Sequence, residues 1–157
     1  MTRWGCQYQN VDLAAITRSN LDLVVVDPSL DDRARRLITK AECEALKKKV
    51  DGTRRIVLAY LSVGEADTKR WHWPAAWLIN EPEWLGPENP KWPGSRSVHY
   101  WHPEWQHLVY NDEHSILGTI LDVGFDGVFL DRADAYGDWS GHPGAMGAMA
   151  ELVFKLG

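Results

Sequence analysis

The run IVLAYLSV at residues 56–63 constrains the fold more than any other feature of the chain. It is apolar, carries no charge and is ended by Gly64-Glu65, which is typical of a strand buried on both faces, as strands of parallel sheets are. The run GVFL at 127–130 has the same character and ends at Asp131. Parallel strands need crossover connections, usually helices, so helical segments are expected beside these runs.

Segments typical of strands and of helices alternate along the whole chain. Strands are predicted at 4–10, 21–26, 55–63 and 127–130, and helices at 11–20, 31–50, 103–123 and 143–156. Pro103 suits the first turn of its helix, and Gly124 suits the end of that helix. The alternation indicates an α/β fold of about four β/α units with right-handed crossovers and a parallel sheet. We expect one domain over residues 1–157, since no repeat or linker divides the chain.

Residues 66–100 form a long insertion between two of these units. Five prolines make it too broken for a long helix or a central strand. Seven of the nine tryptophans lie between residues 71 and 105, and tryptophan faces stack on the apolar faces of sugar rings. The alternative is a small aromatic core that fixes the loop, and we expect this for most of these side chains because large aromatic area is normally buried.

The charge and hydropathy of the chain exclude several classes of function. A net charge of -5 and a pI near 5.6 disfavour nucleic acid, whose phosphates need a clustered basic surface. No run approaches the roughly 18 apolar residues of a membrane-spanning helix. The first ten residues, MTRWGCQYQN, lack the basic and then apolar layout of a signal peptide. A neutral or cationic ligand fits best.

Acidic residues follow three of the predicted strands: Asp27, Glu65 and Asp131. The carboxyl ends of parallel strands face the active site of α/β folds, so these three side chains are predicted to face one cleft. The alternative is that each acid only caps the next helix. In a cluster, one acid is expected to hold its proton and to protonate a leaving oxygen, while an ionised one attacks or stabilises the sugar, as in a glycosidase.

Neither cysteine nor histidine spacing indicates a metal site or a disulfide. Cys6 and Cys43 form no metal or redox motif and are expected to be separate, small, buried residues. His99 and His102, the closest histidines, have no metal-ligand spacing. Motifs for dinucleotides, for phosphate loops and for serine hydrolases are absent from the sequence.

Four longer stretches resemble a known family of enzymes. The stretches VLAYLSVGEAD, WLGPENPKWPG, VHYWHPEWQ and GFDGVFLDRADAY are similar to those of the endo-α-1,4-polygalactosaminidase family of glycoside hydrolases. The weaker stretches WGCQYQN and LVVVDPS extend the likeness from about residue 4 to 139. This resemblance implies a (β/α)8 barrel of the TIM type, hydrolysis of an α-1,4-linked galactosamine-containing polysaccharide, no cofactor, and a secreted or extracytoplasmic protein.

The resemblance also assigns roles to individual residues. Asp131 matches a catalytic aspartate, and the acid paired with it in the family is a glutamate on a later strand, before which this chain stops. Glu65 is the candidate that could replace that glutamate within this chain. The predicted substrate-binding residues are Asp27, Tyr60, Asp134, Tyr100, Trp101 and Tyr136. His102 stands where the family usually has aspartate, so the role of this position is open.

Two consequences follow from this likeness. The chain is expected to be an N-terminal partial barrel, a poor catalyst alone, with open sheet edges that associate with a second copy or with the missing half. Its acidic cleft would attract the ammonium groups of a galactosamine polymer.

Two alternatives remain open at this stage. One is a degenerate barrel that binds glycans without cutting them. The other is an isomerase or lyase whose divalent cation is held by Asp27, Glu65 and Asp131.

Overall fold

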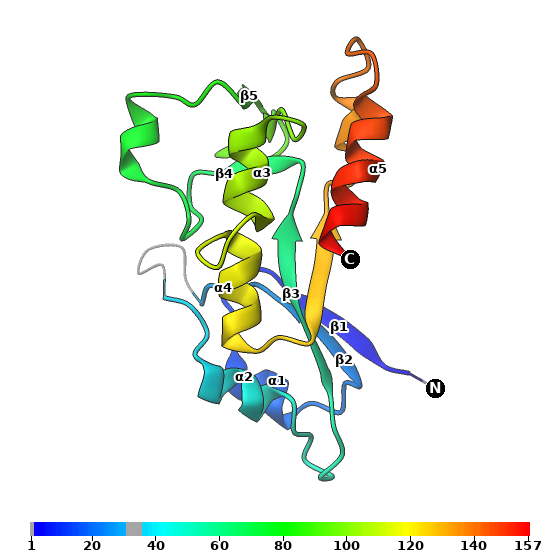
Figure 1. Cartoon of the computed structure of the whole chain (residues 1–157). Coiled ribbons are helices and arrows are strands. Elements are labelled where there is room, and N and C mark those ends of the chain that lie inside the picture. The colour runs from blue at the N-terminus through cyan, green and yellow to red at the C-terminus, as the bar shows by residue number, and fades with distance from the viewer. Residues whose placement is uncertain (1, 31–35) are drawn as a thin grey trace. The chain divides into compact units, whose positions relative to one another are not determined.

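The computed structural model describes residues 2–30 and 36–157 (Figure 1). The elements are, in order, β1 (Trp4–Gln7), α1 (Leu13–Arg18), β2 (Leu23–Val26), α2 (Lys40–Leu46), β3 (Ile56–Ser62), β4 (Glu65–Asp67), the 3-10 helix η1 (Ala75–Leu78), β5 (Leu85–Glu88), β6 (Ser95–Val98), α3 (Pro103–Tyr110), α4 (Ile116–Val123), β7 (Gly127–Asp131), the 3-10 helix η2 (Ala135–Gly137) and α5 (Ala145–Leu156). All four predicted strands are present, each a little shorter than or close to its predicted length.

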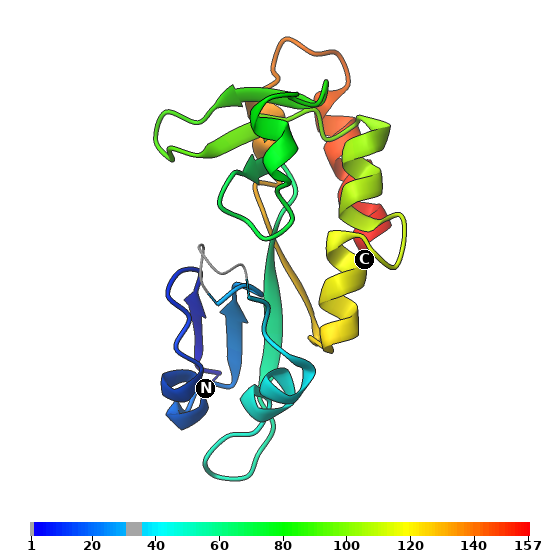
Figure 2. The same cartoon turned by 90° about the vertical axis from the view of Figure 1, so that its left-hand side faces the viewer.

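The main sheet has four strands in the order β1-β2-β3-β7. β1, β2 and β3 are parallel (Figure 2). In their register Gly5 pairs with Val24, and Val24 with Val57. A second sheet of three antiparallel strands has the order β4-β6-β5. Strands of the main sheet are separated by helices, which confirms the predicted α/β fold with a parallel sheet.

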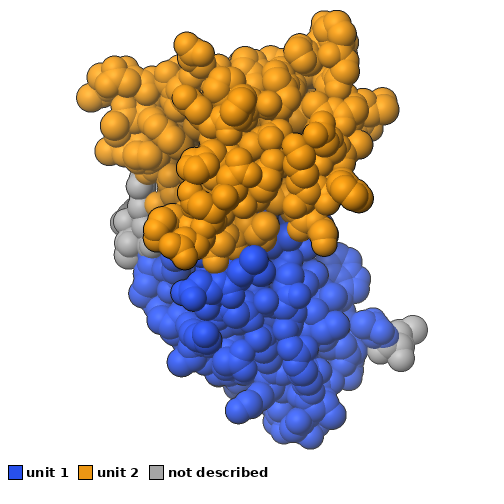
Figure 3. Space-filling model, in the orientation of Figure 1, with its two compact units in different colours: residues 1–61, 119–129 blue, residues 62–118, 130–157 orange. Residues whose placement is uncertain are grey.

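The chain forms two compact units (Figure 3). The first unit comprises residues 1–61 and 119–129, and the second comprises residues 62–118 and 130–157. The chain passes from one unit to the other within β3, α4 and β7. Whether the two units form the single domain expected over residues 1–157 stays a prediction. Each unit is described by itself below.

One face of the sheet in the first unit is buried beneath helices. Val24, Val26, Val57 and Ala59 are at most 1% exposed, and their β-branched or small side chains suit a pleated surface covered by helices. In α2, Cys43 and Leu46 are also buried. The core of this unit is therefore aliphatic, as the apolar runs predicted.

A buried arginine lies beside this aliphatic core. Arg55, directly before β3, is 0% exposed. Its guanidinium donates to the carbonyl oxygens of Leu21 at 3.0 Å, Leu46 at 2.7 Å and Ser19 at 2.8 Å. Ser19 is the C-cap of α1 and Leu46 is the last residue of α2, so the cation satisfies carbonyl groups at the negative ends of two helices.

The predicted helix at 31–50 is shorter in the structure. Residues 31–35 lie outside the described residues, and α2 begins only at Lys40. Thr39 and Glu42 form a capping box that fixes this start. Before it, Leu37 forms an antiparallel bridge with Ser29 and is not helical.

The single helix predicted at 103–123 is wrong, because α3 and α4 are separate. Residues 111–115 form a turn in which Asp112 accepts hydrogen bonds from the backbone of His114 and of Ser115. The Ser115 hydroxyl then accepts from the N–H of Gly118 and starts α4. Polar side chains that bond their own backbone compete with the helix at this point. Within the described residues, no helix is long and apolar enough to cross a membrane.

The insertion is held by a chain of tryptophan rings in the second unit. Ring centroids are 5.2 Å apart for Trp73 and Trp77, 5.0 Å for Trp77 and Trp84, and 4.9 Å for Trp84 and Trp105. Trp73, Trp84 and Trp105 are at most 2% exposed, and the indole of Trp105 donates to the carbonyl of Val63 over 3.1 Å. These four rings confirm the predicted aromatic core.

The two cysteines differ in exposure. Cys43 is buried in α2, and burial raises the pKa of its thiol. Cys6 in β1 is exposed. The expectation of two buried cysteines is therefore right for Cys43 and wrong for Cys6, because the side of β1 that carries Cys6 is not covered.

Two carboxylates of the first unit predict how its stability depends on pH. The backbone N–H of Arg3 and then Lys49 lower the pKa of Asp22 from 3.8 to about 2. Arg36 and then Thr39 lower the pKa of Glu42 from 4.5 to about 2. A depressed carboxyl pKa contributes stability that is present above the unfolded-state value and is lost as pH falls through the folded-state value.

We therefore expect the melting temperature to fall between about pH 4.5 and pH 2, in part through these two groups. Replacing Asp22 by Asn together with Glu42 by Gln should lower the melting temperature at pH 5 and flatten its slope below pH 4.5. Thermal melts from pH 2 to pH 6, followed by far-ultraviolet circular dichroism, measure this. An unchanged slope in the double variant would contradict the assignment.

Candidate functional site

The candidate site is built where β3 and β7 end, in the second unit. The backbone N–H of Val63 donates to the carbonyl of Asp131 over 3.0 Å, which ties the two strand ends together. Gly64 follows and leaves no room for a side chain. A Cβ at this position would lie 2.4 Å from Ala135 Cβ and 2.5 Å from the carbonyl oxygen of Arg132. The acids that follow the two strands are therefore held on closely packed backbone.

Glu65 is a buried carboxylate whose two oxygens both accept hydrogen bonds. Its side chain is 8% exposed. Oε1 accepts from Arg132 Nε at 2.8 Å and from Asn89 Nδ2 at 2.8 Å, and Oε2 accepts from Ser95 Oγ at 2.7 Å. Neither the guanidinium nor the amide nitrogen can accept a proton, so a proton on Oε1 would find no acceptor there. These contacts fix the orientation of the carboxylate.

Arg132 joins the carboxylates around it. Its guanidinium pairs with Glu65, with Asp134 Oδ1 at 3.0 Å, and with Asp138 Oδ2. Burial opposes the charge of Arg132, but the charges of Glu65 and Asp138 prevail and raise its pKa. Its φ of 60° is in the left-handed region, which is rare for a residue other than Gly, Asn or Asp. Such backbone strain, directly after Asp131, is typical of functional sites.

Asp131 is half-buried at the end of β7. Arg70, in the same unit, interacts electrostatically with it. Burial lowers the pKa of Arg70, and the charge of Asp131 acts in the opposite direction. Asp131 is thus a carboxylate that interacts with a cation and has part of its side chain accessible.

Trp101 is enclosed by histidine and tryptophan rings. The imidazole of His142 is stacked on it at 4.1 Å with an interplanar angle of 3°, and His99 lies 5.2 Å away at 25°. Trp139 meets Trp101 edge to face at 5.6 Å. A half-buried indole with a flat ring already stacked on it has the geometry that sugar binding uses, although here a side chain of the protein takes that place.

The other predicted aromatic contacts differ in exposure. Tyr100 is 0% exposed, and its hydroxyl donates to the carbonyl of Ala145 over 2.9 Å. Tyr100 is therefore a core residue of the second unit, and its predicted contact with substrate is not supported. Tyr136 is 37% exposed, and the side chain of Asp134 is 76% exposed.

Two predicted site residues belong to the first unit. Asp27 follows β2, is 2% exposed, and accepts a 2.8 Å hydrogen bond from the N–H of Ser29. Tyr60 lies in β3 with its ring 4.8 Å from that of Tyr8. As predicted, Asp27 directly follows a strand and Tyr60 lies within one. That Asp27 shares a cleft with the acids of the second unit stays a prediction.

His102 takes the structural place of the aspartate expected there. It is the N-cap of α3, and its Nδ1 accepts from the N–H of Glu104 at 3.3 Å. Aspartate caps helices in the same way. The substitution therefore keeps the cap.

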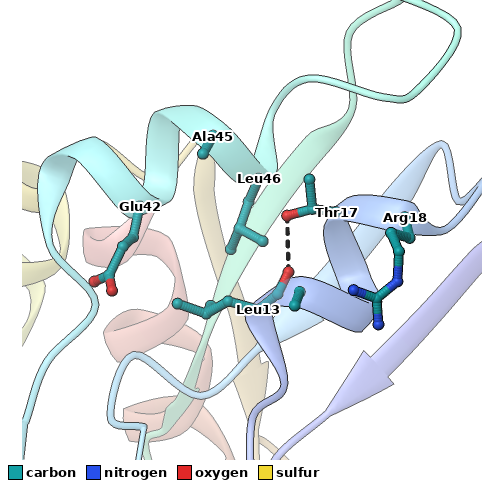
Figure 4. Close-up of a pocket in the computed structure, with 7 residues that line it drawn as sticks. Leu13, Thr17, Arg18, Glu42, Ala45 and Leu46 are labelled. Atoms are coloured by element: carbon teal, nitrogen blue, oxygen red, sulfur yellow. Dashed lines mark hydrogen bonds between the residues drawn. The ribbon is translucent and has the colours of Figure 1, made fainter.

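A groove on the first unit lies outside this constellation (Figure 4). It is lined by side chains of α1 and α2: Leu13, Ala14, Thr17, Arg18, Glu42, Ala45 and Leu46. Glu42, its one acid, is engaged by Thr39 and Arg36, so the groove offers no carboxylate for catalysis. Within residues 2–30 and 36–157, no three His, Cys, Asp or Glu side chains are grouped so that they could hold a metal ion.

A parallel β/α sheet with carboxylates at its strand ends is the arrangement of barrel-type glycoside hydrolases. The chain belongs to the glycoside hydrolase family GH114, whose profile matches residues 1–152. This confirms the family that the sequence resembles.

The relatives are longer than this chain. An uncharacterised protein of Methanocaldococcus jannaschii is 42% identical over 137 residues, which cover 87% of this chain and 37% of that protein. Another, of Deinococcus radiodurans, is 36% identical over 156 residues, which cover 98% of this chain and 47% of that protein. The chain thus spans less than half the length of these curated relatives.

Solved structures share the fold. The glycoside hydrolase domain of PelA from Pseudomonas aeruginosa has a TM-score of 0.68 at 22% identity, over 98% of this chain and 54% of that one. Aspergillus fumigatus Ega3, in complex with galactosamine, has a TM-score of 0.64 at 18% identity, over 97% of this chain and 52% of that one. The four-stranded sheet corresponds to part of such a TIM barrel.

Several residues of the site were not predicted from the sequence. Arg132 and Arg70 supply its cations, and Asn89 and Ser95 hold Glu65. Arg132 had a signal, since it follows Asp131 directly. Asn89 and Ser95 reach Glu65 only because β4 and β6 pair, which no local pattern indicates.

Proposed function

We propose that this chain contributes to a glycosidase that cleaves α-1,4-linked galactosamine-containing polysaccharide, with Asp131 as a catalytic carboxylate. The observation that carries the proposal is the contrast between two acids at neighbouring strand ends. Asp131 is half-buried and interacts electrostatically with Arg70, whereas the side chain of Glu65 is only 8% exposed. Asp131 is the one whose carboxylate is better placed to meet an oxocarbenium-like sugar.

In this proposal Asp131 acts in its ionised form, as the nucleophile or as the group that stabilises positive charge at the sugar carbon. Glu65 acts as a positioning residue and not as the acid that protonates the leaving oxygen, because Arg132, Asn89 and Ser95 already occupy both of its oxygens. The acid is then expected from the part of the barrel that the longer relatives contain, where the family resemblance places a glutamate.

The proposed substrate agrees with the charge of the chain. A galactosamine polymer carries ammonium groups, and the chain has a net charge of -5. Asp134 and Asp138 expose 76% and 43% of their side chains next to the site, where they would attract a cationic sugar at short range. The fold shared with Ega3, a protein solved with galactosamine, supports the same class of substrate.

A second candidate function is glycan binding without hydrolysis. It is favoured by the coverage of the relatives, 37–47% of their length, because the acid that pairs with Asp131 in the family is then missing. In that case the chain would bind galactosamine oligomers through its aromatic and acidic residues and release no reducing ends.

The decisive test is Asp131→Asn, which keeps the shape of the side chain but deletes its charge. We expect it to lower the release of reducing ends from partly deacetylated α-1,4-galactosaminan by at least roughly 10³-fold, with little change in melting temperature. The assay uses the chain as written and the same chain extended by the remaining segment of the Deinococcus radiodurans relative.

The matched control is Asp122→Asn, which removes an exposed carboxylate from α4 and should leave the rate unchanged. Asp131→Asn activity within a few-fold of the unmodified protein would overturn the assignment of Asp131. Binding of the oligomer without release by either the chain or its extended form would instead support the glycan-binding function.

A further inference from the structure

An imidazole covers one face of a tryptophan in the second unit. The rings of His142 and Trp101 have their centroids 4.1 Å apart and an interplanar angle of 3°. Trp101 is half-buried, whereas His142 is exposed. The imidazole therefore lies flat on the indole and yet has solvent beside it, into which it can rotate without leaving a cavity in a core.

The other rings around Trp101 are held by the backbone of the hairpin β5–β6 and the residue after it. The N–H of His99 donates to the carbonyl of Trp84 over 2.7 Å. A Cβ on Gly86 would lie 2.9 Å from Cζ2 of Trp139, so the Trp139 ring packs directly on the backbone of β5. Both rings contact Trp101. They hold the indole in place when His142 moves.

The segment that carries His142, residues 138–144, is bonded mainly to itself. The N–H of His142 donates to the carbonyl of Trp139 over 2.8 Å, and the N–H of Ala145 donates to the carbonyl of His142 over 3.2 Å. Nothing lies within 4 Å of a Cβ built on Gly141 or on Gly144. The backbone at these glycines is not packed on another element, so the segment can shift without breaking a core.

The same cluster of rings contains a buried donor without an acceptor. Nε1 of Trp139 is buried and has no hydrogen-bond partner among the described residues. Buried polar groups in proteins are nearly all paired, so an unpaired one needs an explanation. A hydroxyl oxygen can accept from an indole N–H. The cluster therefore fits a ligand that is rich in hydroxyl groups, as a sugar is.

A carboxylate acts on the surroundings of Trp101. Burial and then the charge of Asp138 raise the pKa of Tyr100, whose ring centroid lies 4.9 Å from that of Trp101. Asp138 pairs with Arg132 and still exposes 43% of its side chain. A partly exposed carboxylate near an aromatic face favours a ligand that carries an ammonium group.

We propose that His142 is a displaceable occupant of Trp101, and that a sugar ring of the substrate takes the place of the imidazole on the indole. Tryptophan offers the flat apolar face on which the apolar face of a sugar stacks. The choice of an amino sugar as ligand rests on the proposed function. Because the imidazole must leave first, the apparent affinity is reduced by the fraction of the protein in which it has left.

The first test follows the imidazole of His142 by nuclear magnetic resonance while an α-1,4-linked galactosamine oligomer is added to the unmodified chain. Ring currents shift the signals of an imidazole that is stacked on an indole, and the spectrum of His142→Ala assigns them. We expect these signals to move to their unstacked positions, with the midpoint that calorimetry gives for binding. An oligomer that binds while the signals stay would overturn the proposal and leave the proposed function standing.

The second test compares affinities for the same oligomer by calorimetry. His142→Ala should bind about 3- to 10-fold more tightly, because no imidazole has to be displaced. Trp101→Ala should bind at least roughly 10-fold more weakly, since the stacking face is lost. In the Trp101→Ala background, His142→Ala should have no further effect. A histidine that only orders its segment would instead act equally in both backgrounds.

The matched control is His114→Ala, which removes a histidine whose side chain is 88% exposed and should leave the affinity unchanged. Unchanged or weaker binding by His142→Ala would overturn the proposal, as would equal tightening by His114→Ala.

A neutral α-1,4-linked galactose oligomer separates this proposal from the proposed function. If only the neutral oligomer moves the His142 signals, the stacking site stands and the cationic substrate is wrong. If neither oligomer binds to the unmodified chain or to His142→Ala, both proposals are wrong.

Discussion

Replacing Arg55 by methionine is expected to destabilise the protein by about 3–5 kcal/mol, the largest effect on stability that we predict for a single side chain. The variant keeps much of the apolar volume but leaves the carbonyls of Ser19, Leu21 and Leu46 without their donor. A buried carbonyl left unpaired costs about 1–3 kcal/mol, in part recovered by relaxation. The stability of Arg55→Lys should lie between that of the unmodified protein and that of Arg55→Met, since an ammonium group keeps the charge but not the fork of donors.

The neighbouring Arg54 provides the control. Its side chain is 60% exposed and pairs with Asp126, so Arg54→Met should cost less than about 1 kcal/mol. Urea unfolding of the three variants, followed by circular dichroism, gives the comparison. If Arg55→Met and Arg54→Met cost the same, the buried guanidinium does not hold the ends of α1 and α2 together.

The second large effect is expected from Gly64→Ala. The added methyl group would meet Ala135 Cβ at 2.4 Å and the carbonyl oxygen of Arg132 at 2.5 Å, both closer than atoms can approach. Because the backbone itself must move, we expect a loss of about 3 kcal/mol or more, at or above the upper end of the usual range for overpacking. The displacement falls on the turn after Asp131, so glycan binding should weaken with stability.

Gly137→Ala is the matched control, since nothing lies within 4 Å of a Cβ there and its φ is not positive. Gly137 also belongs to η2, close in sequence to the same turn. A change in stability within about 0.5 kcal/mol is expected for it. Equal losses in the two variants would mean that packing between the strand ends does not determine the site.

The sequence predicted the parallel sheet well because buried parallel strands carry a local signal. Apolar runs such as those of β3 and β7 are ended by Gly64 and Asp131, and the structure has strands at both. The errors lie where side chains bond the backbone nearby. The turn at residues 111–115 divides one predicted helix into α3 and α4, and the cap at Thr39 shortens another.

The site was less predictable because its partners are distant in sequence. Asp131 and Glu65 were found since acids after parallel strands are a recognisable pattern. The contacts that distinguish the two acids could not be predicted, because Glu65 and Arg132 are separated by 67 positions. Tyr100 could not be assigned from the sequence for the same reason. A tyrosine in an aromatic stretch has the same local pattern whether its hydroxyl faces a ligand or, as here, donates to the distant carbonyl of Ala145.

The uneven placement of tryptophan gives each unit its own optical signal. Trp4 is the tryptophan of the first unit, and the remaining eight of the nine are in the second. Indole emission therefore reports almost entirely on the second unit, and the closely spaced rings of Trp73, Trp77, Trp84 and Trp105 should exchange excitation energy while they are packed. Circular dichroism reports on the backbone of both units. Coincident or separate unfolding curves from these two probes would therefore reveal whether the units melt together or one after the other.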